Sequence, residues 1–218
     1  SLALAAATAF EASRLGLRAG AVVVNHGLQA GSARVAEQAA DVARGLGLDP
    51  VRVVTVDASD APGAGGPEAA ARDARYAALE RERAALGASW ILTGHTRDDQ
   101  AEQVLLGLAR GSGARSLAGM PPARGRFRRP LLGITRAQCR ASAEAQGLTW
   151  WDGPMNEDPA FARVRARRAV AELERDLGLG VAAALARTAF HLRSDADHLD
   201  AAADDAVAPL GGGPWPVV

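Results

Sequence analysis

Short apolar runs alternate with longer helical patterns along this chain, and no other feature constrains its fold as strongly. Three runs, at 21–24, 51–56 and 89–93, contain no regular polar alternation, as expected of strands covered on both faces. Helical patterns accompany them at 2–14, 32–46, 68–86 and 98–109. This β-α-β-α order predicts an α/β fold with a doubly wound, mostly parallel sheet.

Beyond residue 113 the pattern is less regular. A helix, a strand-like run and a long helical stretch follow, at 135–146, 148–151 and 161–202. We expect the long stretch to break near Gly178 and Gly180, since glycine readily ends a helix. The chain closes on a Gly/Pro-rich linker composition at 211–214. These patterns predict a main α/β domain over 1–158 and a helical extension with a linker over 159–218.

Composition excludes several kinds of chemistry. All 25 basic residues are arginines, which rules out a phosphate-binding Walker lysine and a Schiff-base lysine within this chain. The single cysteine, Cys139, cannot form a disulfide within the chain or build a metal site with other cysteines. No apolar run reaches transmembrane length and the first residues lack a signal-peptide pattern. We therefore expect a cytoplasmic protein with no membrane partner.

The segment Gly94–Glu102 places an acidic cluster directly after the third predicted strand. Ligands of open α/β sheets bind at the carboxyl ends of the strands. On the helix that follows, Asp98 and Asp99 lie four and three residues before Glu102, so the three carboxylates are neighbours. Such carboxylates repel each other unless a metal ion or a cationic substrate compensates them, and we predict a catalytic cluster. An acid-rich first turn favoured by the helix dipole is the alternative.

Two further groups of polar residues are candidate nucleotide contacts. Asn25 and His26 end the first predicted strand, and Gly27 allows a sharp turn after them. Arg72 and Arg75 share one helical face with a tyrosine, and paired guanidiniums suit a polyphosphate or a nucleic-acid backbone. The alternatives are a structural histidine and a solvated arginine face.

Glycines and arginines supply the remaining candidates. The segment Gly111-Ser112-Gly113 predicts either an anion-binding nest or an ordinary glycine cap after the helix. Two clusters of arginines, each with a nearby phenylalanine, predict contacts with a nucleic-acid backbone and unstacked bases rather than mere surface charge. Their members are Arg124, Arg126, Arg128 and Arg129, then Arg163, Arg165, Arg167 and Arg168.

In order and spacing, these segments resemble the tRNA(Ile)-lysidine synthetase family of the PP-loop ATP pyrophosphatase superfamily. The resemblance covers nearly the whole chain. The matching stretches are Val24–Leu28, Glu68–Tyr76, Gly94–Glu102, Arg110–Gly113 with Gly119-Met120, Arg129–Leu132, and Asp152 through Asn156 to Phe161 and Arg163.

The resemblance implies a ligase that joins free lysine to the wobble cytidine of tRNA(Ile) with a CAU anticodon, through an adenylated cytidine. It implies ATP and Mg²⁺ as cofactors and allows a homodimer, while the metal ligands stay unassigned. Asp98, Asp99 and Glu102 would hold lysine or the ion and accept a proton. Contacts to the nucleotide would come from Ser1, Asn25, His26, Arg72, Arg75, His95, Gly111, Ser112 and Gly113.

The sequence departs from the family pattern at several positions. Asn25 stands where the family usually has Asp, Gln103 where it has Thr, and Val164 where it often has Asn. Ser1 is similar to the last serine of the family's phosphate loop, whose preceding strand and glycines this sequence does not include. The chain as given is therefore expected to fold, to bind ATP poorly, and to leave a sheet edge unpaired.

Two other functions remain open at this point. A tRNA thiolase of the same superfamily would commonly need a cysteine pair, which the lone Cys139 cannot provide. A non-catalytic nucleotide-binding module of the same fold would leave the acidic cluster and the arginine clusters without a role.

Overall fold

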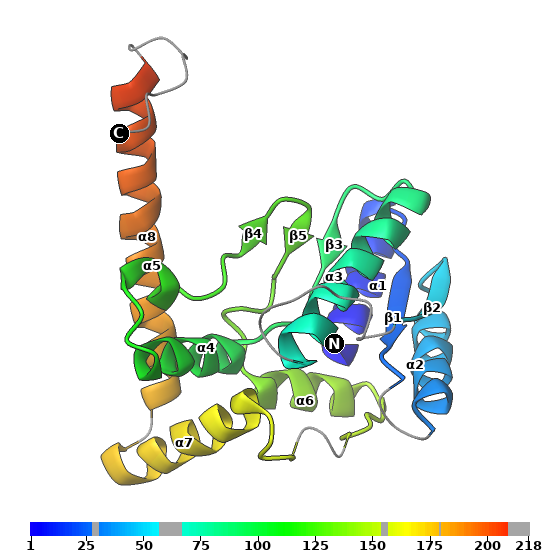
Figure 1. The fold of residues 1–218 in the computed structure, drawn as a ribbon. Helices are drawn as coiled ribbons and strands as arrows, with labels where there is room; N and C mark the ends of the chain where they lie inside the picture. The colour runs from blue at the N-terminus through cyan, green and yellow to red at the C-terminus, as the bar shows by residue number, and fades with distance from the viewer. Residues whose placement is uncertain (28–30, 57–66, 154–156, 179, 209–218) are drawn as a thin grey trace. The chain divides into compact units, whose positions relative to one another are not determined.

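A computed structural model describes residues 1–27, 31–56, 67–153, 157–178 and 180–208 (Figure 1). Its helices are α1 (Leu2–Leu15), α2 (Ser32–Gly45), α3 (Pro67–Ala85), α4 (Arg97–Ala109), α5 (Ala114–Leu117), α6 (Arg136–Ala145), α7 (Ala162–Leu177) and α8 (Val181–Val207). Its strands are β1 (Ala21–Asn25), β2 (Val51–Thr55), β3 (Ile91–Leu92), β4 (Ala123–Arg124) and β5 (Phe127–Arg128). The Gly/Pro-rich end at 211–214 lies outside the described residues.

The chain divides into two compact units. Unit 1 comprises Ser1–Thr96 with Pro122–Phe161, and unit 2 comprises Arg97–Pro121 with Ala162–Val218. The predicted domain boundary at 158 lies close to the end of unit 1. Unit 2 also takes residues 97–121, because α4 packs against α5, α7 and α8.

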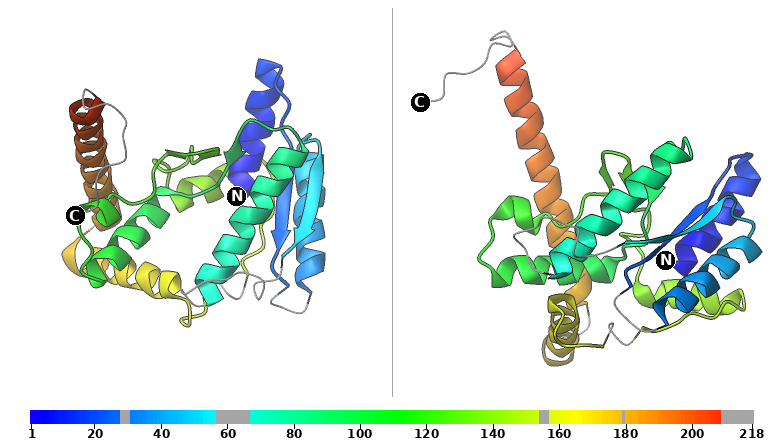
Figure 2. Two further views of the ribbon diagram at one scale, coloured as in Figure 1. Left: turned by 45° about the horizontal axis from the view of Figure 1, so that its top comes forward. Right: turned by 45° about the vertical axis from the view of Figure 1, so that its right-hand side comes forward.

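Unit 1 has the predicted doubly wound α/β fold. Strands β1 and β2 are parallel, with Ala21 opposite Val51 and Asn25 opposite Thr55. Helix α2 packs against both strands and α3 packs against β1, and these two helices cover opposite faces of the pair (Figure 2). Covering on both faces is the physical reason why the valine-rich runs lack polar alternation.

The third predicted strand is correct in position but short. Only Ile91 and Leu92 form β3, which pairs in parallel with β5, while β4 pairs antiparallel with β5. No element was predicted from the sequence between residues 113 and 135, whereas residues 123–128 form this β4–β5 hairpin. The prediction of a strand-like segment at 148–151 was wrong, since these residues form no strand.

The helical predictions beyond residue 130 are confirmed. Helix α6 begins with a capping box, in which the Gln138 backbone N–H donates to the Thr135 hydroxyl at 3.0 Å. Helices α7 and α8 are separated at Gly178 and Gly180, whose φ angles of 97° and 106° lie in the region that glycine favours. Within the described residues, none of the helices has both the length and the apolarity needed to cross a membrane.

Candidate active site

The carboxyl end of β1 forms a tight polar turn in unit 1. The buried Asn25 accepts a hydrogen bond at its Oδ1 from the Gly27 N–H at 3.0 Å, and Gly27 has φ 66°. Beside it, His26 has a buried Nδ1 that contacts no hydrogen-bond partner among the described residues. Burial and, secondly, the positive charge of Arg75 lower the pKa of His26. The lowered pKa favours the neutral ring, whose buried Nδ1 is left for a partner outside the described part of the chain.

The start of α1 lies against the turn that follows β3. A Cβ built on Gly94 would lie 3.0 Å from the Cα of Ser1, so this close approach requires glycine. The next residue, His95, places its Nδ1 3.1 Å from the Thr93 hydroxyl. A helix start presents unsatisfied backbone N–H groups and a partial positive charge, and α1 has no acidic residue in its first turn. The geometry at Ser1 suits an anion such as a phosphate.

Helix α3 contributes a cluster of arginines around one tyrosine. The guanidinium carbons of Arg72 and Arg75 lie 5.5 and 5.8 Å from the Tyr76 ring centroid. The Phe127 ring packs on Tyr76 with centroids 4.8 Å apart, and Arg129 Nη2 donates to the Tyr76 hydroxyl at 3.4 Å. The sequence placed Arg72 and Arg75 on one face correctly, but the aromatic packing behind them was not anticipated.

The arginines around Tyr76 also change its acidity. Burial alone raises the pKa of Tyr76, but the hydrogen bond from Arg129 and the charges of Arg129, Arg72 and Arg75 together outweigh it and lower that pKa. Three guanidiniums thus lie around one phenol, and paired guanidiniums such as those of Arg72 and Arg75 suit a polyphosphate.

Arg129 does not fit its assignment to the surface arginine cluster. Only 4% of this residue is exposed, so it cannot reach an RNA backbone directly. Because side chains alternate along a strand, Arg129 points to the inner side with Phe127, whereas Arg124 and Arg126 are exposed and Arg128 is half-buried.

In unit 2, the predicted acidic cluster is divided by burial. Asp98 and Asp99 are half-buried in the first turn of α4. Glu102 is 2% exposed and accepts a 2.9 Å hydrogen bond from Arg167 Nε of α7. Arg167 was predicted to contact nucleic acid, but its ion pair with Glu102 joins α4 to α7. Within the described ranges, no three acidic, histidine or cysteine side chains are placed to hold a metal ion.

Gln100 has a structural role that sequence reasoning missed. Its Oε1 accepts from the Met120 N–H at 2.7 Å, and its Nε2 donates to the Met120 carbonyl at 2.9 Å. A Cβ on Gly119 would lie 2.7 Å from the Gln100 Oε1, so a glycine is needed there. From α8, Arg193 donates to the Gly119 carbonyl at 3.1 Å. These contacts fix the segment that follows α5.

The glycine-rich turn after α4 has the geometry of a helix cap. The Gly111 N–H donates to the Leu108 carbonyl, and the Ser112 N–H donates to the Gly107 carbonyl, both at 3.0 Å. Gly113 precedes α5 as its N-cap. Two of the three amides are thus used to end α4, which favours the cap over the anion-binding nest.

The remaining predicted arginines lie on α7. Arg165 and Arg168 are exposed and Arg163 is half-buried, while Val164 and Ala166 between them are buried. These arginines therefore lie on the outer side of a helix whose inner side packs in unit 2.

Comparisons with known proteins match most of the chain. The PP-loop domain family matches residues 1–174. The chain is 57% identical over 215 residues to a tRNA(Ile)-lysidine synthase of Thermobifida fusca, covering 98% of this chain and 65% of that protein. It is 59% identical over 206 residues to the same-named protein of Leifsonia xyli, covering 93% and 60%. The chain thus spans about three fifths to two thirds of the length of these relatives.

A solved structure has a related fold. It is the U34-tRNA thiolase NcsA from Methanococcus maripaludis with its [4Fe-4S] cluster, with a TM-score of 0.71 and 16% identity. The similarity covers 89% of this chain and 70% of that chain. At this identity the likeness concerns the fold, and it agrees with the doubly wound arrangement of unit 1.

Proposed function

This chain belongs to the PP-loop domain family, and from that premise we propose that it carries the catalytic part of an ATP-dependent lysidine-forming ligase. The substrates are free lysine and tRNA(Ile) with a CAU anticodon, and ATP is converted to AMP and pyrophosphate. The names of relatives that are 57% and 59% identical support this choice. An enzyme with this tRNA substrate would act in the cytoplasm.

The reaction has two chemical steps. The cytidine oxygen attacks the α-phosphate of ATP, so a P–O bond forms and pyrophosphate leaves. The lysine amine then attacks the activated carbon of the base, forming a C–N bond while the C–O bond to AMP breaks. The amine must lose a proton before or during its attack, and a nearby carboxylate can accept it.

The observation that carries the nucleotide part of the proposal is the position of Ser1 against Gly94. A helix start beside the turn after β3 is a suitable place for a phosphate. In unit 1, Arg72 and Arg75 provide positive charge, and His26 provides a neutral ring for a nucleotide contact. His95 follows Gly94 directly and is the second histidine proposed to contact the nucleotide.

Asp98 and Asp99 are the proposed acceptors for the lysine ammonium and its proton. Both lie in the first turn of α4 and are half-buried. Glu102 lies deeper and is paired with Arg167, so we assign it a positioning role. Arg163, Arg165 and Arg168 supply positive charge for the tRNA backbone.

Mg²⁺ enters this proposal only as the companion of ATP. Magnesium sites in nucleotide enzymes usually use one or two carboxylates together with the phosphates. The described side chains do not form a three-ligand site by themselves. We therefore assign no metal ligand and derive no step through the ion.

Lysine-dependent pyrophosphate release tests the function. The full-length protein is incubated with ATP, radiolabelled lysine and tRNA(Ile) transcript, and both pyrophosphate and labelled tRNA are measured. A ligase incorporates lysine into the transcript with the CAU anticodon and not into one with a GAU anticodon. Absence of incorporation in the presence of ATP turnover would reject the lysine part of the proposal.

The same assay separates the thiolase alternative. A thiolase would form a modified tRNA only with a sulfur donor and would incorporate no lysine. The lone Cys139, in the first turn of α6, does not offer the cysteine pair such enzymes commonly use. A non-catalytic module would bind nucleotide and release no pyrophosphate.

A further inference from the structure

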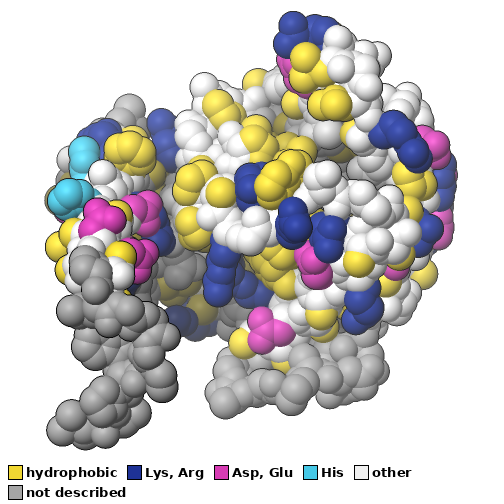
Figure 3. Space-filling view, turned by 90° about the horizontal axis from the view of Figure 1, so that it is seen from above, with side chains coloured by type: hydrophobic (Ala, Val, Ile, Leu, Met, Phe, Trp, Pro, Cys, Tyr) yellow, Lys and Arg dark blue, Asp and Glu magenta, His cyan; other side chains and the backbone are white. Residues whose placement is uncertain are grey.

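A tryptophan lies exposed at the amino end of β3, outside the candidate active site. Trp90 immediately precedes β3 and is 49% exposed. The Arg128 guanidinium carbon lies 3.8 Å from its ring centroid and the Arg126 carbon lies 5.7 Å away. We call Trp90, Arg126 and Arg128 the Trp90 platform. Figure 3 shows one face of the protein, on which dark blue arginine side chains lie beside yellow hydrophobic ones.

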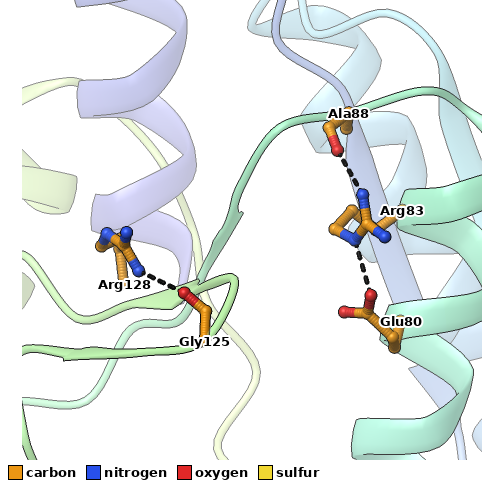
Figure 4. A network of polar contacts seen from close by, with 5 residues as sticks. All are labelled: Glu80, Arg83, Ala88, Gly125 and Arg128. Carbon is orange, nitrogen blue, oxygen red and sulfur yellow. Dashed lines mark hydrogen bonds and ion pairs between the residues drawn. The ribbon is translucent and has the colours of Figure 1, made fainter.

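The platform is held in place by backbone contacts. Arg128 Nη1 donates to the Gly125 carbonyl at 2.8 Å and to the Phe127 carbonyl at 2.9 Å, as Figure 4 shows for Gly125. On the other side, Arg83 donates to the Ala88 carbonyl at 2.8 Å and so anchors the loop that leads into Trp90 (Figure 4). Both the tryptophan and the arginine stacked on it are therefore restrained before any ligand binds.

The charge of the platform is not compensated by acidic side chains. Among the described residues, Arg124, Arg126 and Arg128 form no ion pair with a carboxylate, whereas the nearby Arg83 is paired with Glu80 at 2.8 Å. An exposed indole next to uncompensated guanidiniums suits a ligand with a flat face and negative charge. Unpaired nucleotides have both, since bases stack on aromatic rings and phosphates bind arginine.

The platform is separate from the turn that contacts Ser1. Ile91 pairs with Phe127 in a parallel register, so Trp90 and Arg126 lie together at the amino ends of β3 and β5. Gly94 follows four residues later, which in an extended chain is a separation of about 13 Å. The platform therefore lies at the amino ends of β3 and β5, whereas Ser1 lies against the turn at the carboxyl end of β3.

We propose that the Trp90 platform is a second RNA-binding site, on which an unpaired base stacks against Trp90 while Arg126 contacts the adjoining phosphate. The proposal rests on the proposed function in that tRNA supplies the RNA. It adds a contact for a nucleotide other than the wobble cytidine.

The chain contains a matched control for this proposal. Trp150 is also exposed and also lies near an arginine, with the Arg140 carbon 5.6 Å from its ring centroid. There, however, Asp152 accepts hydrogen bonds from Arg140 at 2.8 Å and from the Trp150 indole at 3.2 Å. The positive charge is neutralised, so this second tryptophan should not bind RNA.

The experiment compares Trp90→Leu, Trp150→Leu and Arg126→Gln in the full-length protein. Binding to a fluorescent single-stranded oligonucleotide and to tRNA(Ile) transcript is measured over a range of salt concentrations. Trp90→Leu should weaken single-strand binding about tenfold, within the range for loss of one stacked base. Trp150→Leu should leave it unchanged. Arg126→Gln should lower the salt dependence by about 0.7, the value for one phosphate contact on a single strand.

Several outcomes would overturn the proposal. Equal affinities for wild type and Trp90→Leu, with unchanged thermal midpoints, would remove the stacking role. A loss of the same size in Trp150→Leu would show that exposed tryptophans act non-specifically. A change of oligomeric state in Trp90→Leu without a change in RNA affinity would identify the platform as a protein interface. If Trp90→Leu does not fold, an unchanged salt slope in Arg126→Gln decides against RNA.

The result is distinguishable from failure of the proposed function. Single-strand binding is measured without ATP or lysine, so a protein that makes no lysidine can still pass this test. Conversely, lysidine synthesis with unchanged binding in Trp90→Leu would reject only the platform.

Discussion

Replacing Gln100 with leucine should destabilise unit 2 strongly, although the two side chains have similar volume. In the native structure the amide satisfies both the N–H and the carbonyl of Met120, at 2.7 and 2.9 Å. Gln100 and Met120 are both buried, so water does not readily replace these bonds. Leucine would leave two buried backbone groups without their partner.

The size of the effect follows from these two hydrogen bonds. Leaving a buried donor or acceptor unsatisfied costs about 1–3 kcal/mol, and relaxation of the segment around Met120 will recover part of the sum. We expect the free energy of unfolding to fall by about 2–4 kcal/mol, a large share of the roughly 5–15 kcal/mol that stabilises an ordinary domain. Substitution by glutamate should be at least as damaging, because the Nε2 donor is lost and a charge is buried.

Urea unfolding monitored by circular dichroism measures this change. Gln103→Ala is the matched control, since Gln103 lies on the same helix, is half-buried, and forms no hydrogen bond through its side chain within the described structure. The control should shift stability by less than about 1 kcal/mol, as is usual away from buried polar contacts. A loss below about 0.5 kcal/mol in Gln100→Leu would refute the argument, because it would mean that the Met120 backbone finds other partners at little cost.

Three further predictions concern catalysis, RNA and pH. Asp99→Ala should lower the rate of lysidine formation by about 10²–10⁴-fold, as for loss of a general base. The thermal midpoint of unfolding should stay unchanged. Near wild-type turnover at saturating lysine would contradict the catalytic role of Asp99. Charge reversal at Arg163 and Arg165 should weaken tRNA binding and reduce the dependence of log affinity on log salt concentration by about two units or slightly less. ATP affinity should stay constant. An unaltered salt dependence would mean that both arginines are ordinary surface charges. Because burial lowers the pKa of His26 in the folded state, the unfolded chain binds a proton there more readily, and the free energy of unfolding falls as the pH drops through the ordinary histidine value of 6.5. His26→Gln should flatten the fall in stability between pH 7.5 and 5.5 in urea titrations, and an identical fall would show that other groups cause it.

The elements that depend on local periodicity could be predicted from the sequence. The valine-rich runs became β1 and β2, and the glycines at 178 and 180 separate α7 from α8. The pairing of β5 with β3, more than thirty residues earlier, was missed because no local pattern reports such a pairing. A usable signal was nevertheless present, since Arg126 and Arg128 alternate with Phe127 as side chains do along a strand.

The candidate site could be predicted by residue type but not by partner. The spacing of Asp98 and Glu102 correctly puts them on neighbouring turns of one helix, yet it does not show that Arg167 of α7 pairs with the buried Glu102. Nor does this spacing show that the side-chain amide of Gln100 hydrogen-bonds to the backbone of Met120, twenty residues away. Which member of a polar cluster is buried depends on tertiary contacts, and these decide whether a carboxylate can reach a substrate or stabilises a helix pair instead.

The four arginines around Phe127 have two different roles, and the local backbone structure decides which arginine has which role. In a loop without regular structure, all four arginines would have been equivalent candidates for RNA contact. Alternation along β5 instead sends Arg129 inward to the Tyr76 hydroxyl and leaves Arg128 outside on the Trp90 ring. The inner arginine supports the α3 tyrosine around which Arg72 and Arg75 are arranged, so its effect on RNA is indirect. The outer one belongs to the Trp90 platform, whose arginines form no ion pair with a described carboxylate, so among these four arginines direct RNA contact is proposed only on the outer side.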